Sequence, residues 1–165
     1  MINKIITMIA AAAMVTAAGG AVYADSCGVF RRDNDAAKAV VDKYMEAVMK
    51  SYRGDDVSFR GIVKEGCDFW YYNEYNNELI GSISRCAGLA DEADYTVDYS
   101  GLTYSGSSYT VTADVTQHIK YRGMDEPIDR TTRHTFTVAQ DGCEMYIVSD
   151  DAGGAGNLLT ISDIL

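Results

Sequence analysis

Basic residues are scarce in this chain of 165 residues, which has 14 lysines and arginines against 24 aspartates and glutamates and a net charge of −10. Proteins that bind nucleic acids or anionic membrane surfaces do so through concentrated positive charge. The composition therefore argues against both as partners. The sequence also lacks the G-x-S-x-G, H-E-x-x-H, P-loop and dinucleotide-binding patterns. We accordingly predict no catalytic residues, no cofactor and no metal.

The chain also lacks an apolar run long enough to cross a bilayer. Residues 5–18 are apolar, but this run of about 14 residues falls short of the roughly 20 that a membrane helix needs. It follows Lys4 and precedes the small-residue ending Val22-Tyr23-Ala24, which is the pattern of a secretory signal peptide. We predict cleavage after Ala24 and a mature protein that is secreted or held in the cell envelope. A lipid anchor on Cys27 is an alternative that Asp25 disfavours.

None of the four cysteines forms a C-x-x-C pair, so no redox motif or zinc ribbon is indicated. An even number of cysteines in an exported chain predicts two disulfides. A helix over 67–83 would hold Cys67 and Cys86 about 25 Å apart, whereas a bridge needs Cα atoms within about 7 Å. We therefore predict the pairs Cys27–Cys86 and Cys67–Cys143, with free thiols as the alternative.

Two helices are predicted in the first half of the chain. Residues 34–53 follow the N-cap residue Asp33, end before Gly54, and carry one apolar stripe at helical spacing. The stripe consists of Ala37, Val40, Val41, Tyr44, Met45, Val48 and Tyr52. An irregular connection follows over 54–66, with a small apolar patch of Phe59, Ile62 and Val63.

The second predicted helix, 67–83, contains the richest aromatic stretch, and Gly81 could end it. The helical period places one set of apolar side chains on a common face toward the sheet, with Tyr75 at its margin: Phe69, Tyr72, Leu79, Ile80 and Ile83. Trp70 and Tyr71 lie off that face. They are expected either to cover the N-terminal segment or the 54–66 connection, or to form an exposed patch for a partner.

The second half of the chain predicts antiparallel strands. Apolar residues alternate with polar ones from Tyr109 to Ile119, and His134, Phe136 and Val138 share one face of the next strand. Asp141-Gly142 is a hairpin signal before a last strand. The order indicates an α+β fold, with two N-terminal helices on a bent antiparallel sheet of three to five strands. We predict a signal peptide over 1–24, an extended segment over 25–33, one domain over 34–151, and a Gly-rich link with a short apolar tail over 152–165.

The last hairpin carries a family resemblance. His134, Phe136, Asp141, Gly142, Ile147, Ser149 and Asp150 match a His-x-Phe-x-Leu strand, a turn and a Trp-x-Ile-x-Ser-Asp strand, although Val138 replaces the Leu and Met145 the Trp. The pattern resembles the nuclear-transport-factor-like superfamily, in particular small exported domains that precede amidase domains in bacterial proteins. The resemblance extends over about residues 34–151, but no amidase domain follows in this sequence. The resemblance implies a cone-shaped fold with a cavity, not an activity.

The chain has two histidines, His118 and His134. If Tyr121 faces Arg130 in the hairpin, Gln117 faces His134 on the apolar side and His118 faces Arg133 on the wet side. His134, Gln117 and Tyr72 are then the candidate pocket residues. Asp150 and Asp151 are expected to be exposed carboxylates at the end of the last strand.

Three functions are compatible with these residues. The favoured one is a secreted, non-enzymatic binding or accessory domain for a small ligand or an envelope partner protein. The first alternative is an enzyme that uses His134 as a pocket acid or base. The second is a structural interaction domain whose pocket is filled by its own side chains. The ligand, the partner and the oligomeric state are not indicated by the sequence.

Overall fold

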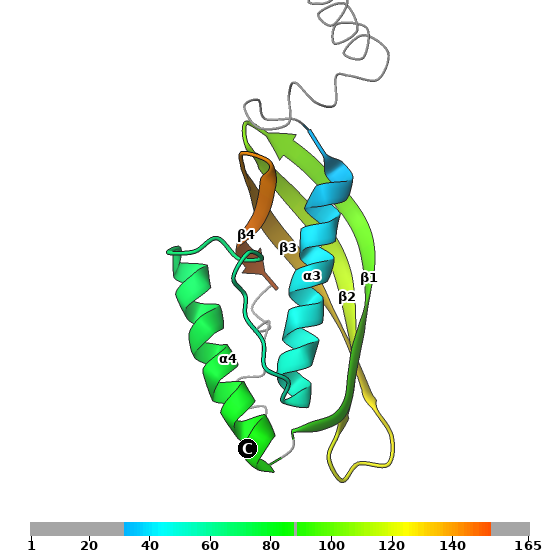
Figure 1. Cartoon of the computed structure of the whole chain (residues 1–165). Coiled ribbons are helices and arrows are strands. Elements are labelled where there is room, and N and C mark those ends of the chain that lie inside the picture. Colours follow the sequence, from blue (N-terminus) through cyan, green and yellow to red (C-terminus); the bar gives the residue numbers. More distant parts are fainter. Residues whose placement is uncertain (1–31, 88, 153–165) are drawn as a thin grey trace, which may run out of the picture.

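The computed structural model describes residues 32–87 and 89–152 and has two helices on one side of a four-stranded antiparallel open sheet (Figure 1). The strand order is β1-β2-β3-β4. The elements are α3 (Asn34–Arg53), α4 (Asp68–Ala87), β1 (Ala90–Ser105), β2 (Ser108–Tyr121), β3 (Ile128–Asp141) and β4 (Glu144–Asp151). The predicted α+β class is therefore confirmed. The predicted signal peptide, the predicted extended segment over 25–33 apart from its end, and the tail beyond Ala152 lie outside the described residues. Among the residues that the structure describes, no helix is both long and apolar enough to cross a membrane.

Helix α3 forms as predicted. Asp33 caps it, with its side-chain Oδ1 accepting from the Ala36 N–H at 2.9 Å, and Gly54 ends it in the left-handed conformation at φ 83°. All seven stripe residues are buried against the sheet and the rest of the core. Two tyrosines of β1 hydrogen-bond to Asp42 of the helix. The Tyr95 hydroxyl donates to the Asp42 backbone carbonyl at 2.9 Å, and the Tyr99 hydroxyl donates to the Asp42 carboxylate at 2.7 Å. α3 therefore lies in the core, where it packs against the sheet and against α4.

Helix α4 differs from the prediction in length and in orientation. It continues through Gly81 to Ala87. It packs chiefly against α3 and contacts the sheet mainly at β4. On the side of α4 that packs inward, Asn73 is buried and Phe69 and Trp70 are partly buried. Tyr72, expected to be packed, is 44% exposed. The side chains of Ile80 and Ile83 lie outside the part of the chain that the structure describes.

The connection between the helices is irregular but well packed. Phe59 and Val63 from the predicted patch are buried, and Ile62 is partly buried against the core. The backbone at Ile62–Lys64 adds to the outer edge of β4: the Lys64 N–H donates to the Ile147 carbonyl, and the Ile147 N–H donates to the Ile62 carbonyl, both at 2.9 Å. This short bridge protects the edge of β4.

The alternation predicted for β2 and β3 is confirmed, but the register between them is displaced. His134 lies opposite Ala113 rather than Gln117, and Gln117 lies opposite Arg130. The turn is centred earlier than expected, because Gly123 adopts φ 85° and the Met124 N–H closes onto the Tyr121 carbonyl at 3.1 Å. Since the displacement is by an even number of residues, every side chain keeps its predicted face. His134 still points into the core.

The displaced register also changes the surroundings of His118. It lies opposite Asp129, not Arg133, and its Nδ1 is 2.8 Å from the Asp129 carboxylate. This pair is on the solvent side of the sheet, with 37% of the His118 side chain exposed. Exposed pairs of this kind contribute about 1 kcal/mol or less to stability.

Candidate functional site

A β-bulge in β4 determines which aspartate enters the core. Val138 pairs with Ile147, but the next pair outward is Thr137 with Ser149, so Val148 is the extra residue. An extra residue reverses the alternation beyond it. Asp150 therefore lies opposite Phe136 and faces inward. Without the bulge, the side chain of Asp150 would face solvent, as the sequence predicted, so that expectation is wrong for Asp150.

The bulge joins Asp150 to His134 in a buried pair. The Nδ1 atom of His134 lies 3.0 Å from both carboxylate oxygens, and the two side chains are 3% and 0% exposed. The imidazole stacks on Phe136, with ring centres 5.3 Å apart and planes tilted by 12°. Carboxylate and ring packing together fix the orientation of the imidazole.

Burial dominates the electrostatics of this pair. Loss of water raises the pKa of the Asp150 carboxyl, and the hydrogen bond and charge of His134 counteract part of that rise. The phenol of Tyr44 is fully buried, and its pKa is raised well above the ordinary value, mainly by burial and further by the charge of Asp150. Tyr44 donates to the Asn73 amide oxygen at 3.2 Å, and Asn73 donates to the Phe69 carbonyl at 2.7 Å. The core thus contains two hydrogen-bonded polar pairs, His134–Asp150 and Tyr44–Asn73, and the charge of Asp150 acts on Tyr44.

The arrangement has one feature of an acid–base site. A carboxylate that holds Nδ1 fixes the tautomer and leaves Nε2 to exchange a proton. No hydrogen bond from Nε2 is found within residues 32–87 and 89–152. A substrate, however, must reach Nε2, and only 3% of the side chain is exposed. The geometry therefore favours a pair that holds the core together.

The two histidines make this conclusion testable. Diethyl pyrocarbonate acylates accessible, neutral imidazole. We expect it to modify His118 in the folded protein and to leave His134 unmodified until the protein unfolds, because their side chains are 37% and 3% exposed. Peptide mass spectrometry with and without urea measures both sites in one sample. Rapid modification of His134 in the folded state, at a rate near that of His118, would contradict the buried arrangement.

The other predicted pocket residues do not join His134. Gln117 shares its side of the sheet but lies opposite Arg130, and its buried Nε2 atom has no hydrogen-bond partner among the residues that the structure describes. Tyr72 stacks on Phe69, with ring centres 6.4 Å apart, at the rim of the polar core. Asp150 is the pocket residue that sequence reasoning missed, because the position of the bulge carries no sequence signal apart from the Ser-Asp ending of the resemblance.

The predicted aromatic patch is divided by the structure. Trp70 packs against the core at the base of α4, whereas Tyr71 is 65% exposed. Tyr75, one turn further along the helix, is 67% exposed. The exposed aromatics of α4 are therefore tyrosines. The N-terminal segment that Trp70 was expected to cover lies outside the described residues.

The cysteines do not form the bridge predicted in the described part of the chain. Cys67 is a free thiol, so it is not joined to Cys143. Its sulfur sits at the start of α4, where it accepts from the Trp70 N–H at 3.4 Å and lies 4.0 Å from the Val148 carbonyl. The predicted Cys27–Cys86 bridge involves side chains outside the described residues.

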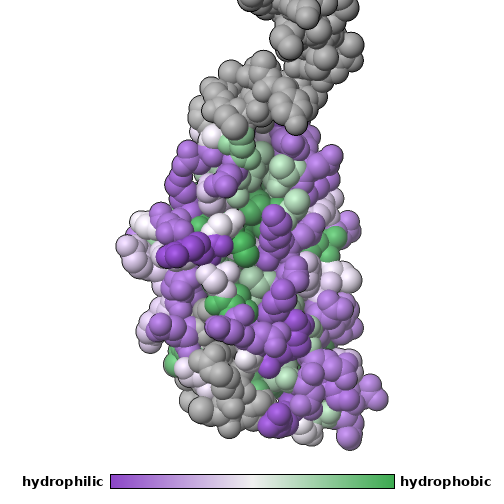
Figure 2. All heavy atoms as spheres, viewed as in Figure 1, coloured by the Kyte–Doolittle hydropathy of each residue, from purple (hydrophilic) through white to green (hydrophobic). Residues whose placement is uncertain are grey.

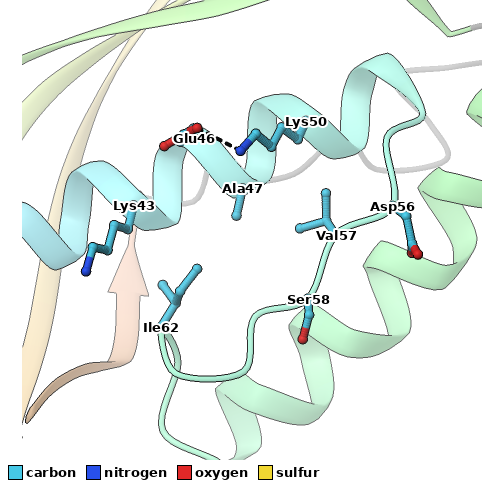
Figure 3. Close-up of a pocket in the computed structure, with 8 residues that line it drawn as sticks. All are labelled: Lys43, Glu46, Ala47, Lys50, Asp56, Val57, Ser58 and Ile62. Atoms are coloured by element: carbon cyan, nitrogen blue, oxygen red, sulfur yellow. Dashed lines mark ion pairs between the residues drawn. The ribbon is translucent and has the colours of Figure 1, made fainter.

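Two adjoining hollows open on the outer flank of α3, and together we call them the α3 trough. The first, of about 200 Å³, lies between α3 and the connection, where Ala47, Val57 and Ile62 form an apolar floor (Figure 3). The second, of about 290 Å³, lies between α3 and the start of β4 and is lined mainly by Ala36, Ala39, Val40, Gly61 and Met145. Figure 2 shows apolar residues in this region with hydrophilic residues around them.

Lys43 lines both hollows. Lys50 pairs with Glu46 at 2.7 Å, whereas Lys43 makes no ion pair with any residue that the structure describes. The trough therefore combines an apolar floor with a lysine that lines both hollows, while the carboxylates of Asp56 and Glu144 line one hollow each. Neither hollow is lined by His134.

No family model matches this sequence, and no curated protein or solved structure shows significant similarity to it. Across residues 32–87 and 89–152, no group of three or more His, Cys, Asp or Glu side chains could hold a metal ion. Function must therefore be inferred from the geometry.

Proposed function

We propose that the chain is an exported, non-enzymatic binding domain with a cone-like α+β fold. In this proposal it holds a segment of a partner protein in the α3 trough. The observation that carries the proposal is the contrast between the two polar features of the molecule. The His134–Asp150 pair is closed to solvent, whereas the trough around Lys43 is open and has an apolar floor. Exposed apolar surface bordered by polar residues is typical of interaction sites.

The size and charge of the trough define the kind of segment it would accept. A cavity of about 150 Å³ is enough for one benzene ring, so each hollow has room for a large apolar side chain. Lys43 lines both hollows and favours an acidic residue between the two apolar ones, whereas Asp56 and Glu144 line one hollow each and disfavour negative charge at the ends of the segment. The expected ligand is therefore a segment with an acidic residue flanked by two apolar ones. Apolar anchors in pockets supply most of the affinity of such interfaces, and the charge supplies specificity.

The charge of Lys43 gives a direct test with two blocked tripeptides, Leu-Asp-Leu and Leu-Lys-Leu. The protein should bind the acidic tripeptide more tightly, and Lys43→Glu should reverse that preference, because it replaces the cation shared by both hollows with an anion. Titration calorimetry or ligand-observed NMR measures both affinities. We expect each change of sign to alter affinity by about threefold to tenfold, as an exposed charge pair does.

The matched control is Ser82→Glu, which adds the same charge at an exposed position of α4. It should leave the preference unchanged. If Lys43→Glu and Ser82→Glu shift the preference equally, the effect arises from overall charge, and the trough is not the site. A second variant, Ala39→Trp, places a large side chain in the second hollow from an exposed position. It should weaken the binding of both tripeptides.

Acid–base catalysis is the second candidate function, and one observation favours it. Asp150 holds Nδ1 of His134 in the arrangement that orients a general base. Catalysis would require the buried pair to become accessible, so that a substrate reaches Nε2. The diethyl pyrocarbonate experiment distinguishes the two functions, since an opening of this kind makes His134 reactive in the folded protein.

A further inference from the structure

One half of β3 has an open edge. The strand runs from Ile128 to Asp141, but β4 pairs only with Thr135–Asp141. Residues 128–134 therefore have β2 on one side and no described strand on the other (Figure 1). Unpaired backbone N–H and C=O groups on such an edge are a template for another strand.

The described chain stops at the first position of this edge. Asp151 lies opposite Thr135, so the next residue, Ala152, reaches the level of His134. Ala152 is 7% exposed, which places it on the buried side of the sheet. If the same register continues, residue 153 falls opposite Arg133 and residue 158 opposite Ile128. The strand therefore ends next to the open edge, with Asp151 opposite Thr135.

The side chains of that segment suit the edge. The inward positions of the continued register are residues 152, 154, 156 and 158, which are Ala, Gly, Gly and Leu. The small residues leave room beside His134, Thr132 and Arg130. In that register Leu158, the first large apolar residue, would lie opposite Ile128, which is 46% exposed. Cross-strand apolar pairs of this kind stabilise a sheet.

We propose that residues 153–158 add to the open edge of β3 as a continuation of β4, with Leu158 covering Ile128. Because glycine is a poor strand former, the added strand is weak and opens more readily than the rest of the sheet. The interaction surface is therefore the backbone edge at 128–134, and its occupant is this chain's own segment.

Amide hydrogen exchange tests the proposal, because an added strand protects the alternate N–H groups of residues 128–134 that point away from β2. We expect these groups to exchange about tenfold faster after truncation at Ala152. Adding a synthetic peptide of residues 153–165 should slow them again. Leu158→Asp in the full chain should speed the same amides, so the test does not depend on the truncated form. Leu165→Asp, beyond the register, is the matched control.

The amides of Val111 and Val115 in β2 report whether each variant remains folded. Equal exchange at 128–134 in the full and truncated chains would overturn the proposal, whether the rates are fast or slow. Fast exchange means that the edge is open, and slow exchange means that something other than the tail covers it. Equal effects of Leu158→Asp and Leu165→Asp would also overturn it.

Discussion

Replacing Asp150 by alanine is expected to lower the free energy of unfolding by about 3 kcal/mol or more, because it leaves the buried imidazole of His134 without its partner. Both side chains are almost completely excluded from water, at 3% and 0% exposure. The lost hydrogen bonds cannot be replaced by solvent. Urea unfolding at neutral pH, followed by circular dichroism, measures the change.

The neighbouring residue supplies a matched control. Asp151 has the same side chain but is exposed, one position further along β4. Asp151→Ala should change the free energy of unfolding by about 0.5 kcal/mol or less, as most surface substitutions do. If the two alanine variants lose the same stability, the His134–Asp150 pair does not hold the core. Asp150→Asn, which keeps the shape and one acceptor, should fall between them.

The second large effect is a loss of stability in alkali. The pKa of Tyr44 is raised well above its ordinary value, chiefly by burial. Above pH ~10 the unfolded chain therefore releases a proton that the folded chain retains. Stability due to Tyr44 is fully present below that pH and falls by about 1.4 kcal/mol for each further pH unit. Tyr99, whose pKa burial also raises, adds a smaller loss because it is partly exposed.

Unfolding free energies measured in urea at several values between pH 9 and pH 11.5 test this expectation. Tyr44→Phe removes the titrating group, so its stability should decline less steeply with pH than that of the unsubstituted chain. Tyr71→Phe, at a 65% exposed position of α4, is the control and should leave the slope unchanged. An identical slope in the Tyr44 variant and the unsubstituted chain would contradict the role given to burial.

The parts of the fold that were predictable are those fixed by local chemistry. Asp33, Gly54 and the apolar stripe between them determine α3 without reference to the rest of the chain. The alternation in β2 and β3 likewise determines which side chains are buried. That is why His134 was placed on the correct face even though its predicted partner, Gln117, was wrong.

The parts that were not predictable depend on tertiary packing. The orientation of α4 follows from its contact with α3, which brings Phe69 against Tyr44, with ring centres 5.7 Å apart, and turns Tyr72 outward. The bulge at Val148 that turns Asp150 inward leaves no periodic signal in a strand of eight residues. The α3 trough is built partly from an irregular connection, so neither helical nor strand periodicity could place it.

In the proposed function the open α3 trough, and not the closed polar core, is the binding surface, and one measurement tests that assignment most directly. Amide chemical shifts of the isotope-labelled protein are recorded while the blocked tripeptide Leu-Asp-Leu is added. We predict that the shifts concentrate at Ala39, Lys43, Val57 and Ile62, which line the α3 trough. Shifts concentrated instead at His134, Phe136 and Asp150 would show that the core pair is the binding site and would contradict the account.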